Sequence, residues 1–290
     1  MERSIVMLQK LKGFIEEKRL NFYDLAVMTD NGIESSKLQP CNNCNDSYSI
    51  AKAFTMTGIG LLADQGLVRA EDRLADILRD QLSEGIDPKW EDVTIEHVLK
   101  HRWGNGTDFF DIDNNDANDY GTDYLGFILR HPLAYRPGSV YVYNDAGFYL
   151  LGRAIHALSG ETMDQFLMKR LTAPLHFSEV AWSLCPHGHP IAGTGLYVQA
   201  KDMVKLAWLY QNGGVYEGRR ILSEEWVNQV IDRQYELAPL REGSQWIGKA
   251  GMNGQMICFS AQKRIAVAWH SYEPNQGDKL FIDYLHEISE

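Results

Sequence analysis

The sequence lacks long hydrophobic runs, a basic charge excess and a recognisable export signal. No stretch approaches the roughly 18 consecutive apolar residues of a membrane-spanning helix, so we expect no membrane association. Lys and Arg total 28 and Asp and Glu total 39, which gives a formal net charge of −11. This balance argues against nucleic acid as a partner, because binding it requires a basic stripe. Residues 1–19 contain no apolar block with a cleavage site, which predicts a soluble cytoplasmic protein.

Cysteine is also scarce, with four in 290 residues, too few for a disulfide scaffold. Cys41 and Cys44 have the C-x-x-C spacing of zinc or redox sites, and Cys185–His189 could add further ligands. The sequence does not show whether these groups meet in space, so plain loop thiols are the favoured interpretation. We expect no metal and no cofactor.

Several common catalytic signatures are missing as well. The chain has no G-x-S-x-G elbow, no H-E-x-x-H and no glycine-rich phosphate loop. Its composition, 44% hydrophobic and 23% charged, is nevertheless that of a globular protein. No repeat or Gly/Ser linker divides it, which predicts a single catalytic domain over residues 1–290.

Hydrophobic periodicity predicts strands at both chain ends with helices between them. Strands are expected at 20–28, 255–260 and 265–269, with a tight turn at 30–32. Helices are expected at 2–18, 49–65, 70–82, 94–101, 123–131, 145–159, 163–173, 199–212, 224–232 and 278–288.

This order predicts an α/β fold of the α+β type. An antiparallel sheet would be assembled from both chain ends, flanked by the terminal helices, with a mainly helical lobe inserted. The sheet lobe would comprise about 1–48 and 240–290, and the helical lobe about 49–239. A functional site is expected in the cleft between the lobes.

The first motif with candidate chemistry is Ser49-Ile-Ala-Lys52, which opens a strongly apolar helix. Ser49 and Lys52 are three positions apart and so share one helix face. A serine in the first turn meets free backbone N–H groups and the positive end of the helix dipole. A lysine that is shielded from water and lies near another cation has a lowered pKa. It loses its proton easily and can then deprotonate a serine. The alternative is that Ser49 is only a helix N-cap.

The second motif is Tyr143-Asn144-Asp145, which directly precedes a helical run. A tyrosine at this position could carry protons with the help of neighbouring cations. The alternative is that Tyr143 forms part of a wall and that Asp145 is an N-cap.

The third motif is Lys249-Ala250-Gly251, before the C-terminal hairpin. Lys249 could supply positive charge to the Tyr and Lys pair, and Gly251 would let a substrate lie against the strand edge. The N–H of Met252 could point at an oxyanion. The alternative is an exposed strand lysine.

In their order and spacing these motifs resemble those of the serine β-lactamase and penicillin-binding-protein superfamily, which are S-x-x-K, Y-x-N and K-T-G or H-x-G. The similarity is greatest to the branch of class C β-lactamases, D-alanyl-D-alanine peptidases and esterases. Residues 94–104 and 193–202 also resemble its T-I-x-x-L-L-x-H-x-S-G and G-G-L-x-S-T-A-x-D segments. The resemblance covers about residues 20–288 and implies a β-lactamase/transpeptidase-like fold.

The resemblance also implies a role for each matching residue. Ser49 would be the nucleophile that forms an acyl-enzyme, with Lys52 as its partner base. Tyr143 would carry protons to the leaving group and later activate water, and which of the two takes the serine proton stays open. Lys249 would engage a substrate carboxylate, and the N–H groups of Ser49 and Met252 would form the oxyanion hole. The supporting positions are Asn144, Asp145, Ala250 and Gly251.

Two positions depart from the family pattern. Asp145 replaces an Asn, so an anion could hold Lys52 charged and slow acylation. Ala250 replaces the Thr or Ser that would donate a hydrogen bond to a β-lactam or D-alanine carboxylate. We therefore predict a serine hydrolase that acts on an ester, amide or β-lactam carbonyl of a small-molecule or peptide-like substrate. The alternative is a non-hydrolytic penicillin-binding or sensing module that is acylated without turnover.

Residues 103–129, here called the acidic segment, carry six Asp side chains and no Lys, Arg or Glu. The stretch Asp111–Asn115 begins like a calcium loop, but Asp116 and Thr122 stand where an EF-hand needs Gly and Glu. If the acidic segment borders the cleft, it should repel anionic substrates at low ionic strength. We then expect a preference for neutral or cationic esters and amides.

Overall fold

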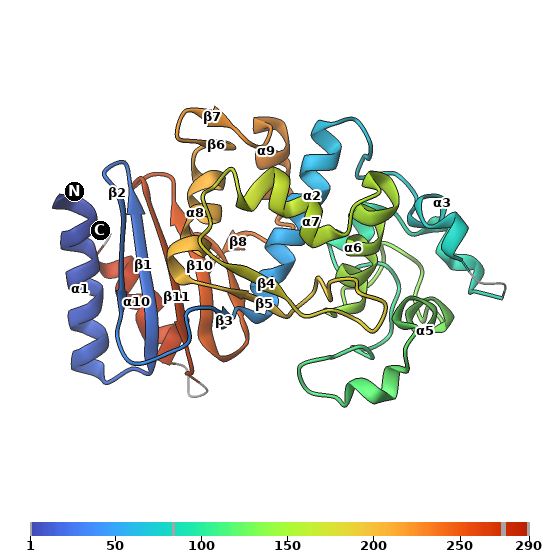
Figure 1. Cartoon of the computed structure of the whole chain (residues 1–290), viewed down its shortest axis with the longest axis horizontal. Coiled ribbons are helices and arrows are strands. Elements are labelled where there is room, and N and C mark those ends of the chain that lie inside the picture. The colour runs from blue at the N-terminus through green and yellow to red at the C-terminus, as the bar shows by residue number, and fades with distance from the viewer. Residues whose placement is uncertain (1, 83–84, 274–276, 289–290) are drawn as a thin grey trace.

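A computed structural model describes residues 2–82, 85–273 and 277–288. Its main sheet is antiparallel and has the strand order β2-β1-β11-β10-β9-β8 (Figure 1). The strands of this sheet are β1 Phe22–Thr29, β2 Gly32–Lys37, β8 Ala238–Pro239, β9 Ile247–Gly251, β10 Gln255–Ser260 and β11 Ile265–Ser271. Because β1 pairs directly with β11, the two chain ends build one sheet, as predicted.

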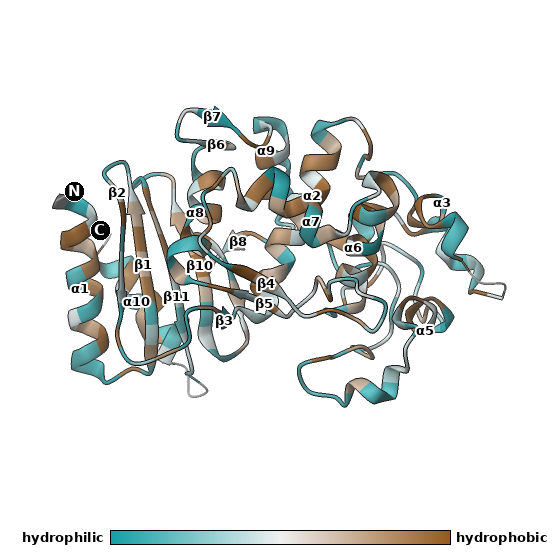
Figure 2. Cartoon of the chain, in the orientation of Figure 1, coloured by the Kyte–Doolittle hydropathy of each residue, from teal (hydrophilic) through white to brown (hydrophobic). Residues whose placement is uncertain are grey.

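Alternate side chains of the sheet are buried on opposite faces, since successive residues of a strand point to opposite sides. In β1, Leu25 belongs to the core beneath the terminal helices α1, Glu2–Lys18, and α10, Gly277–Glu287. Ala26 belongs to the other core, which continues into the helical part and includes α8, Ala200–Gln211. Hydrophobic and hydrophilic stretches both occur along α1 (Figure 2), as expected of a helix with one face on a sheet.

The predicted tight turn joins β1 to β2. Thr29 pairs with Gly32 across the turn, and Gly32 has a φ of +107°. Glycine adopts this conformation without the strain that a side chain would cause.

The remaining elements form the helical part and two small sheets. Its helices are α2 Ala51–Asp64, α3 Leu74–Ile77, α4 Ile95–Leu99, α5 Tyr124–Arg130, α6 Ala146–Ser159, α7 Met163–Leu167 and α9 Glu224–Arg233. The small sheets comprise β3 Asn45–Asp46, β4 Val180–Trp182 and β5 Leu196–Val198, and β6 Val215–Tyr216 and β7 Arg219–Arg220. Helix α2 is buried along most of its length, as its apolar sequence predicts. None of the described helices is long and apolar enough to cross a bilayer.

Two predicted helices are wrong in length. The prediction at 70–82 reduces to α3 and a following 3-10 turn, because the chain before α3 pairs with a distant segment. There the N–H of Glu96 donates to the carbonyl of Ala70 over 2.8 Å. The prediction at 163–173 becomes α7 followed by a π-helical turn over Met168–Thr172.

Candidate active site

Ser49 lies in a short 3-10 turn, Tyr48–Ile50, that leads into α2. Tyr48, directly before it, has a φ of +48°, a conformation that non-glycine residues rarely adopt. The carboxylate of Asp46 accepts the N–H of Tyr48 over 2.8 Å and so helps to hold this turn. Ser49 is therefore half-buried at the start of a buried helix, as the S-x-x-K motif predicts.

Lys52 is completely buried, and its ammonium donates to three acceptors. These are Ser49 Oγ at 3.0 Å, the carbonyl oxygen of Gly193 at 2.8 Å and the carboxylate of Asp145. All three N–H donors of an ammonium are thus used. Burial alone would lower the pKa of Lys52, but neighbouring charges, led by Asp145, outweigh it and raise the pKa. Lys52 is therefore a charged group in the resting site.

Tyr143 joins Ser49 to the third motif. Its hydroxyl donates to Ser49 Oγ over 2.7 Å and accepts from Lys249 Nζ over 3.3 Å. The ammonium groups of Lys52 and Lys249 lie 4.8 and 5.0 Å from the centre of its ring. Residues from α2, from the segment before α6 and from β9 thus meet around one serine oxygen.

Asn144 and Asp145 have different tasks at the start of α6. Asn144 is buried, and its Oδ1 accepts the N–H of Gly147 over 2.9 Å, which caps the helix. Asp145 occupies the N-cap position but makes no side-chain cap, because its carboxylate binds Lys52. Asp145 therefore stands at the N-cap position, as the alternative interpretation has it, but its side chain binds Lys52 instead of capping the helix.

The end of β9 lies against the turn that carries Ser49. A Cβ at Gly251 would collide with the carbonyl oxygen of Ser47, so this approach requires glycine. Ala250 and Met252 on either side are exposed. An oxyanion hole formed by the N–H groups of Ser49 and Met252 stays a prediction.

Sequence reasoning missed two buried residues of the site, His101 and Glu236. Glu236 Oε2 lies 2.6 Å from Lys249 Nζ, and its Oε1 lies 2.9 Å from His101 Nε2. Burial alone would raise the pKa of Glu236, but Lys249 and then His101 outweigh it and lower the pKa to about 2. Glu236 is therefore a full negative charge beside Lys249.

The position of Glu236 results from the pairing of β8 with β9, in which Ala238 lies opposite Gly248. The only signal in the sequence is an acidic residue between the apolar residues Tyr235 and Leu237. His101 lies within the family-like segment 94–104, but that resemblance assigns it no role.

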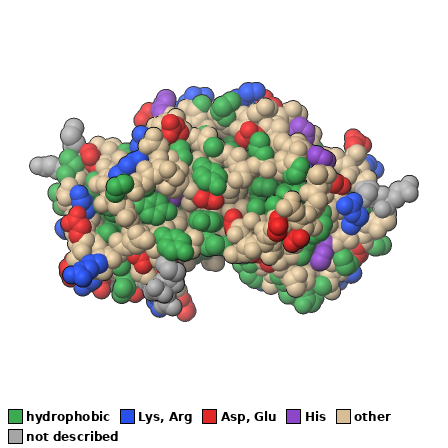
Figure 3. Space-filling model, turned by 60° about the horizontal axis from the view of Figure 1, so that its bottom comes forward, with side chains coloured by type: hydrophobic (Ala, Val, Ile, Leu, Met, Phe, Trp, Pro, Cys, Tyr) green, Lys and Arg blue, Asp and Glu red, His purple; other side chains and the backbone are tan. Residues whose placement is uncertain are grey.

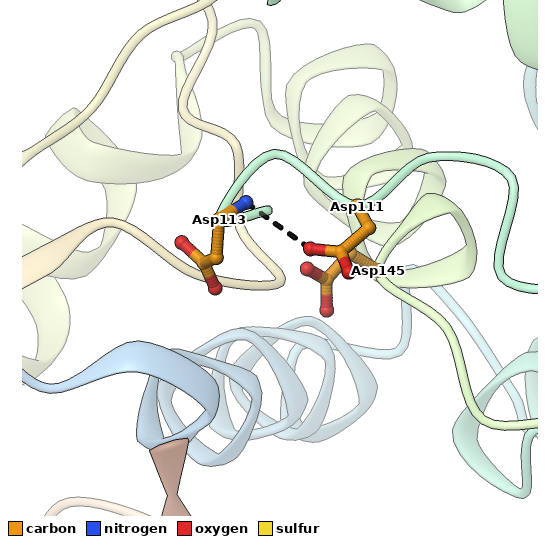
Figure 4. Close-up of side chains that lie close together, drawn as sticks. All are labelled: Asp111, Asp113 and Asp145. Atoms are coloured by element: carbon orange, nitrogen blue, oxygen red, sulfur yellow. Dashed lines mark hydrogen bonds between the residues drawn. The ribbon is translucent and has the colours of Figure 1, made fainter. Parts of the chain in front are cut away.

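The acidic segment reaches the groups around Ser49. Carboxylate oxygens of Asp111, Asp113 and Asp145 all lie within 4.8 Å of one another (Figure 4). Thr194 Oγ1 donates to both oxygens of Asp113, over 2.8 and 3.0 Å. Burial is the largest cause that raises the pKa of Asp113, and likewise of Asp108, to about 6. Asp145 in this group is already paired with Lys52, so the acidic segment adds negative charge on that side of Ser49.

A cavity of about 490 Å³ opens next to Tyr143 and Lys249. The cations Lys100, Arg102 and Arg233 contribute to its lining. On the face shown in Figure 3, acidic side chains (red) lie near the middle as well as toward both ends, and basic ones (blue) lie mostly toward the edges.

The two cysteines of the C-x-x-C motif have separate surroundings. Cys41 Sγ donates to the carbonyl of Tyr23 over 3.7 Å, and Cys44 Sγ contacts Glu179 Oε2 at 3.6 Å. Both are free thiols, and within the described residues neither belongs to a group of three possible metal ligands.

The chain is similar to several known proteins. The family model described as Beta-lactamase matches residues 42–284. Penicillin-binding protein 4 of Amycolatopsis lactamdurans is 27% identical over 206 residues, which cover 61% of this chain and 53% of that protein. N-acetylmuramyl-L-alanine amidase of Bacillus subtilis is 25% identical over 129 residues, which cover 42% of this chain and 29% of that protein. This chain thus spans about half the length, or less, of these curated relatives.

Solved structures show the same fold at low identity. A family VIII carboxylesterase is 14% identical, with a TM-score of 0.77 over 99% of this chain and 98% of that one. A penicillin binding protein from Bacillus halodurans is 17% identical, with a TM-score of 0.72 over 96% and 98%.

Proposed function

The chain belongs to the beta-lactamase family, and from this premise we propose that it is a serine hydrolase in which Ser49 forms an acyl-enzyme with an ester or amide carbonyl. One observation carries the proposal: Ser49 Oγ is contacted by both Lys52 and Tyr143, at 3.0 and 2.7 Å. This is the hydrogen-bond reach between nucleophile and proton carrier that covalent catalysis needs.

Acylation would run through Tyr143 rather than Lys52. The Lys52 ammonium already donates three hydrogen bonds and is held charged by Asp145. For this step the Tyr143 hydroxyl would turn its own proton from Ser49 toward the leaving atom, so that its oxygen can accept. As Ser49 Oγ bonds to the carbonyl carbon, the serine proton would move to the Tyr143 oxygen. Tyr143 would pass a proton to the leaving oxygen or nitrogen as the bond to that atom breaks. Lys249, 3.3 Å from this oxygen, stabilises the negative charge that develops on it.

Deacylation would use the same groups in reverse. A water molecule takes the place of the leaving group and gives a proton to the Tyr143 oxygen as it attacks the acyl carbon. The ester bond to Ser49 Oγ then breaks, the serine oxygen regains a proton, and the carboxylic acid leaves.

Labelling with a fluorophosphonate tests this proposal. The wild-type protein should gain the mass of one phosphonyl group, and Ser49→Ala should gain none. Ser47→Ala is the matched control, because Ser47 Oγ donates to the carbonyl of Leu196 and contacts no catalytic group; it should label like the wild type. Labelling of Ser49→Ala, or none of the wild type, would disprove the assignment of Ser49.

Acylation without turnover is the second candidate, and the Lys52–Asp145 pair favours it. A lysine held charged by Asp145 contributes no base to deacylation, and Ala250 offers no side-chain donor to the substrate. Product release from nitrocefin or p-nitrophenyl butyrate distinguishes the two. More than one product per protein molecule establishes a hydrolase, whereas a single burst with a stable adduct establishes a binding module.

A further inference from the structure

The charge of Lys249 already has a partner inside the protein. Its Nζ lies 2.6 Å from Glu236 Oε2, and the two side chains are only 13% and 3% exposed. Glu236 is fixed in turn by His101, whose Nε2 lies 2.9 Å from Oε1. His101 Nδ1 accepts the N–H of Asn144, so Nε2 carries the proton and donates it to Glu236.

The positive charge of each lysine in the site is therefore neutralised by its own carboxylate. Lys52 is paired with Asp145 and Lys249 with Glu236. Burial lowers the pKa of His101, so the imidazole adds no positive charge at neutral pH. Among the residues that the structure describes, a carboxylate that enters the site meets no buried lysine without a carboxylate partner. The acidic segment adds further negative charge near Asp145.

Position 250, next to Lys249, also provides no side-chain hydrogen-bond donor for a substrate carboxylate. Ala250 has no hydroxyl where the family motif places a Thr or Ser donor. Lys249 instead has two fixed partners, Glu236 and the Tyr143 hydroxyl. The geometry keeps its ammonium beside the tyrosine oxygen rather than free for a substrate group.

We propose that Glu236 makes this site selective for substrates without a carboxylate beside the scissile carbonyl, by pairing with Lys249 and holding it at Tyr143. The inference rests on the proposed function, and it names the substrate class as uncharged esters and amides. Glu236 is thus a specificity-determining residue that acts through Lys249.

Two substrates that differ in one charge test this inference: 3-carboxyphenyl butyrate and its methyl ester, 3-(methoxycarbonyl)phenyl butyrate. The wild type should show a kcat/KM at least about tenfold higher for the methyl ester. About 0.5 M NaCl should leave most of this preference in place, because close buried charges are poorly screened. Equal kcat/KM values for the two esters in the wild type would overturn the inference without any variant.

Glu236→Gln should reduce the ratio of the two kcat/KM values, methyl ester over carboxylate, about tenfold. The substitution leaves the Lys249 charge without its partner and within direct reach of the substrate. Glu96→Gln is the matched control. Glu96 pairs with Lys100 and Arg233, which line the same cavity, at 2.9 and 2.7 Å. This control should keep the ratio within about twofold, because the charges it frees lie farther from the reacting carbonyl.

The ratio of the two esters separates specificity from a merely structural role. If Glu236→Gln lowers both activities equally, or if Glu96→Gln narrows the ratio as much, the inference is wrong. If Glu236→Gln does not fold, the inference is tested by the wild type alone, through its kcat/KM ratio for the two esters with and without 0.5 M NaCl. Ester hydrolysis that persists in Ser49→Ala would instead contradict the proposed function.

Discussion

Asp145 controls the charge state of Lys52, the group next to the proposed nucleophile Ser49. Its carboxylate pairs with the fully buried Lys52 and raises the pKa of that ammonium. Asp145→Asn removes this negative charge and leaves more net positive charge around Ser49, which stabilises an anionic transition state. We expect the rate of fluorophosphonate labelling at neutral pH to rise about tenfold, equivalent to about 1.4 kcal/mol off the barrier.

The same substitution should reduce stability, because it leaves a buried ammonium without its counter-charge. A lower melting temperature together with faster labelling would be the signature of this pair. Asp111→Asn is the control, since Asp111 lies within 4.8 Å of Asp145 but makes no bond to Lys52. Slower labelling of a folded Asp145→Asn variant would show that the pair assists acylation.

Two helical glycines show how the same substitution has opposite effects in different elements. Nothing lies within 4 Å of a Cβ added at Gly13 in α1, whereas one at Gly60 in α2 would collide with the indole of Trp226 in α9. Gly13→Ala should raise the free energy of unfolding by about 0.5–1 kcal/mol, because alanine favours the helix. Gly60→Ala should lower it by about 2 kcal/mol, through overpacking.

Chemical denaturation of both variants measures these changes directly. If Gly60→Ala were as stable as Gly13→Ala, α9 would have to be able to move away from α2. That outcome would contradict the tight contact between these two helices.

Elements with a strong local pattern could be predicted from the sequence, and those set by distant pairing could not. The short apolar strands β10 and β11 and the continuously apolar α2 fall close to their predicted ranges. The helix predicted at 70–82 fails because its first residues pair with the chain around Glu96.

The residues of the candidate site differ in the same way: some belong to local sequence motifs, and others reach the site only through the pairing of distant strands. Ser49, Lys52, Tyr143 and Lys249 form short motifs whose order identifies the family. Glu236 has no motif, and only the two-residue strand β8 brings it beside Lys249. A contact that depends on the pairing of two strands leaves no local pattern to read, so the pairing of each lysine with its own carboxylate could not be predicted.

At the scale of the whole molecule, the net charge of −11 is unevenly placed. Six negative charges lie in the acidic segment, and two of its carboxylates, Asp111 and Asp113, lie within 4.8 Å of Asp145. Because the sheet is built from both chain ends, β9 brings Lys249 to the same site, where Glu236 is its partner. A substrate bound at Ser49 would therefore meet a negative field near Asp145.

This field should favour a cationic ester over a neutral one of the same shape. We expect butyrylcholine to exceed 3,3-dimethylbutyl butyrate in kcat/KM by several-fold, roughly threefold to tenfold, at low ionic strength. Added salt should narrow this ratio, because partly exposed charges are screened over about 10 Å at 0.1 M. Titration of the catalytic groups affects kcat/KM for both substrates equally, so it cancels in their ratio.

The preference should also depend on pH. Burial raises the pKa of Asp108 and Asp113 to about 6, so both are ionised above that pH and take up protons below it. The preference for the cation should be complete near pH 8 and fall as the pH drops through about 6. Replacing both with Asn should remove this pH dependence, whereas Asp119→Asn, at an exposed position of the same segment, should keep it. A ratio that is constant with salt and pH would exclude the acidic segment from substrate selection.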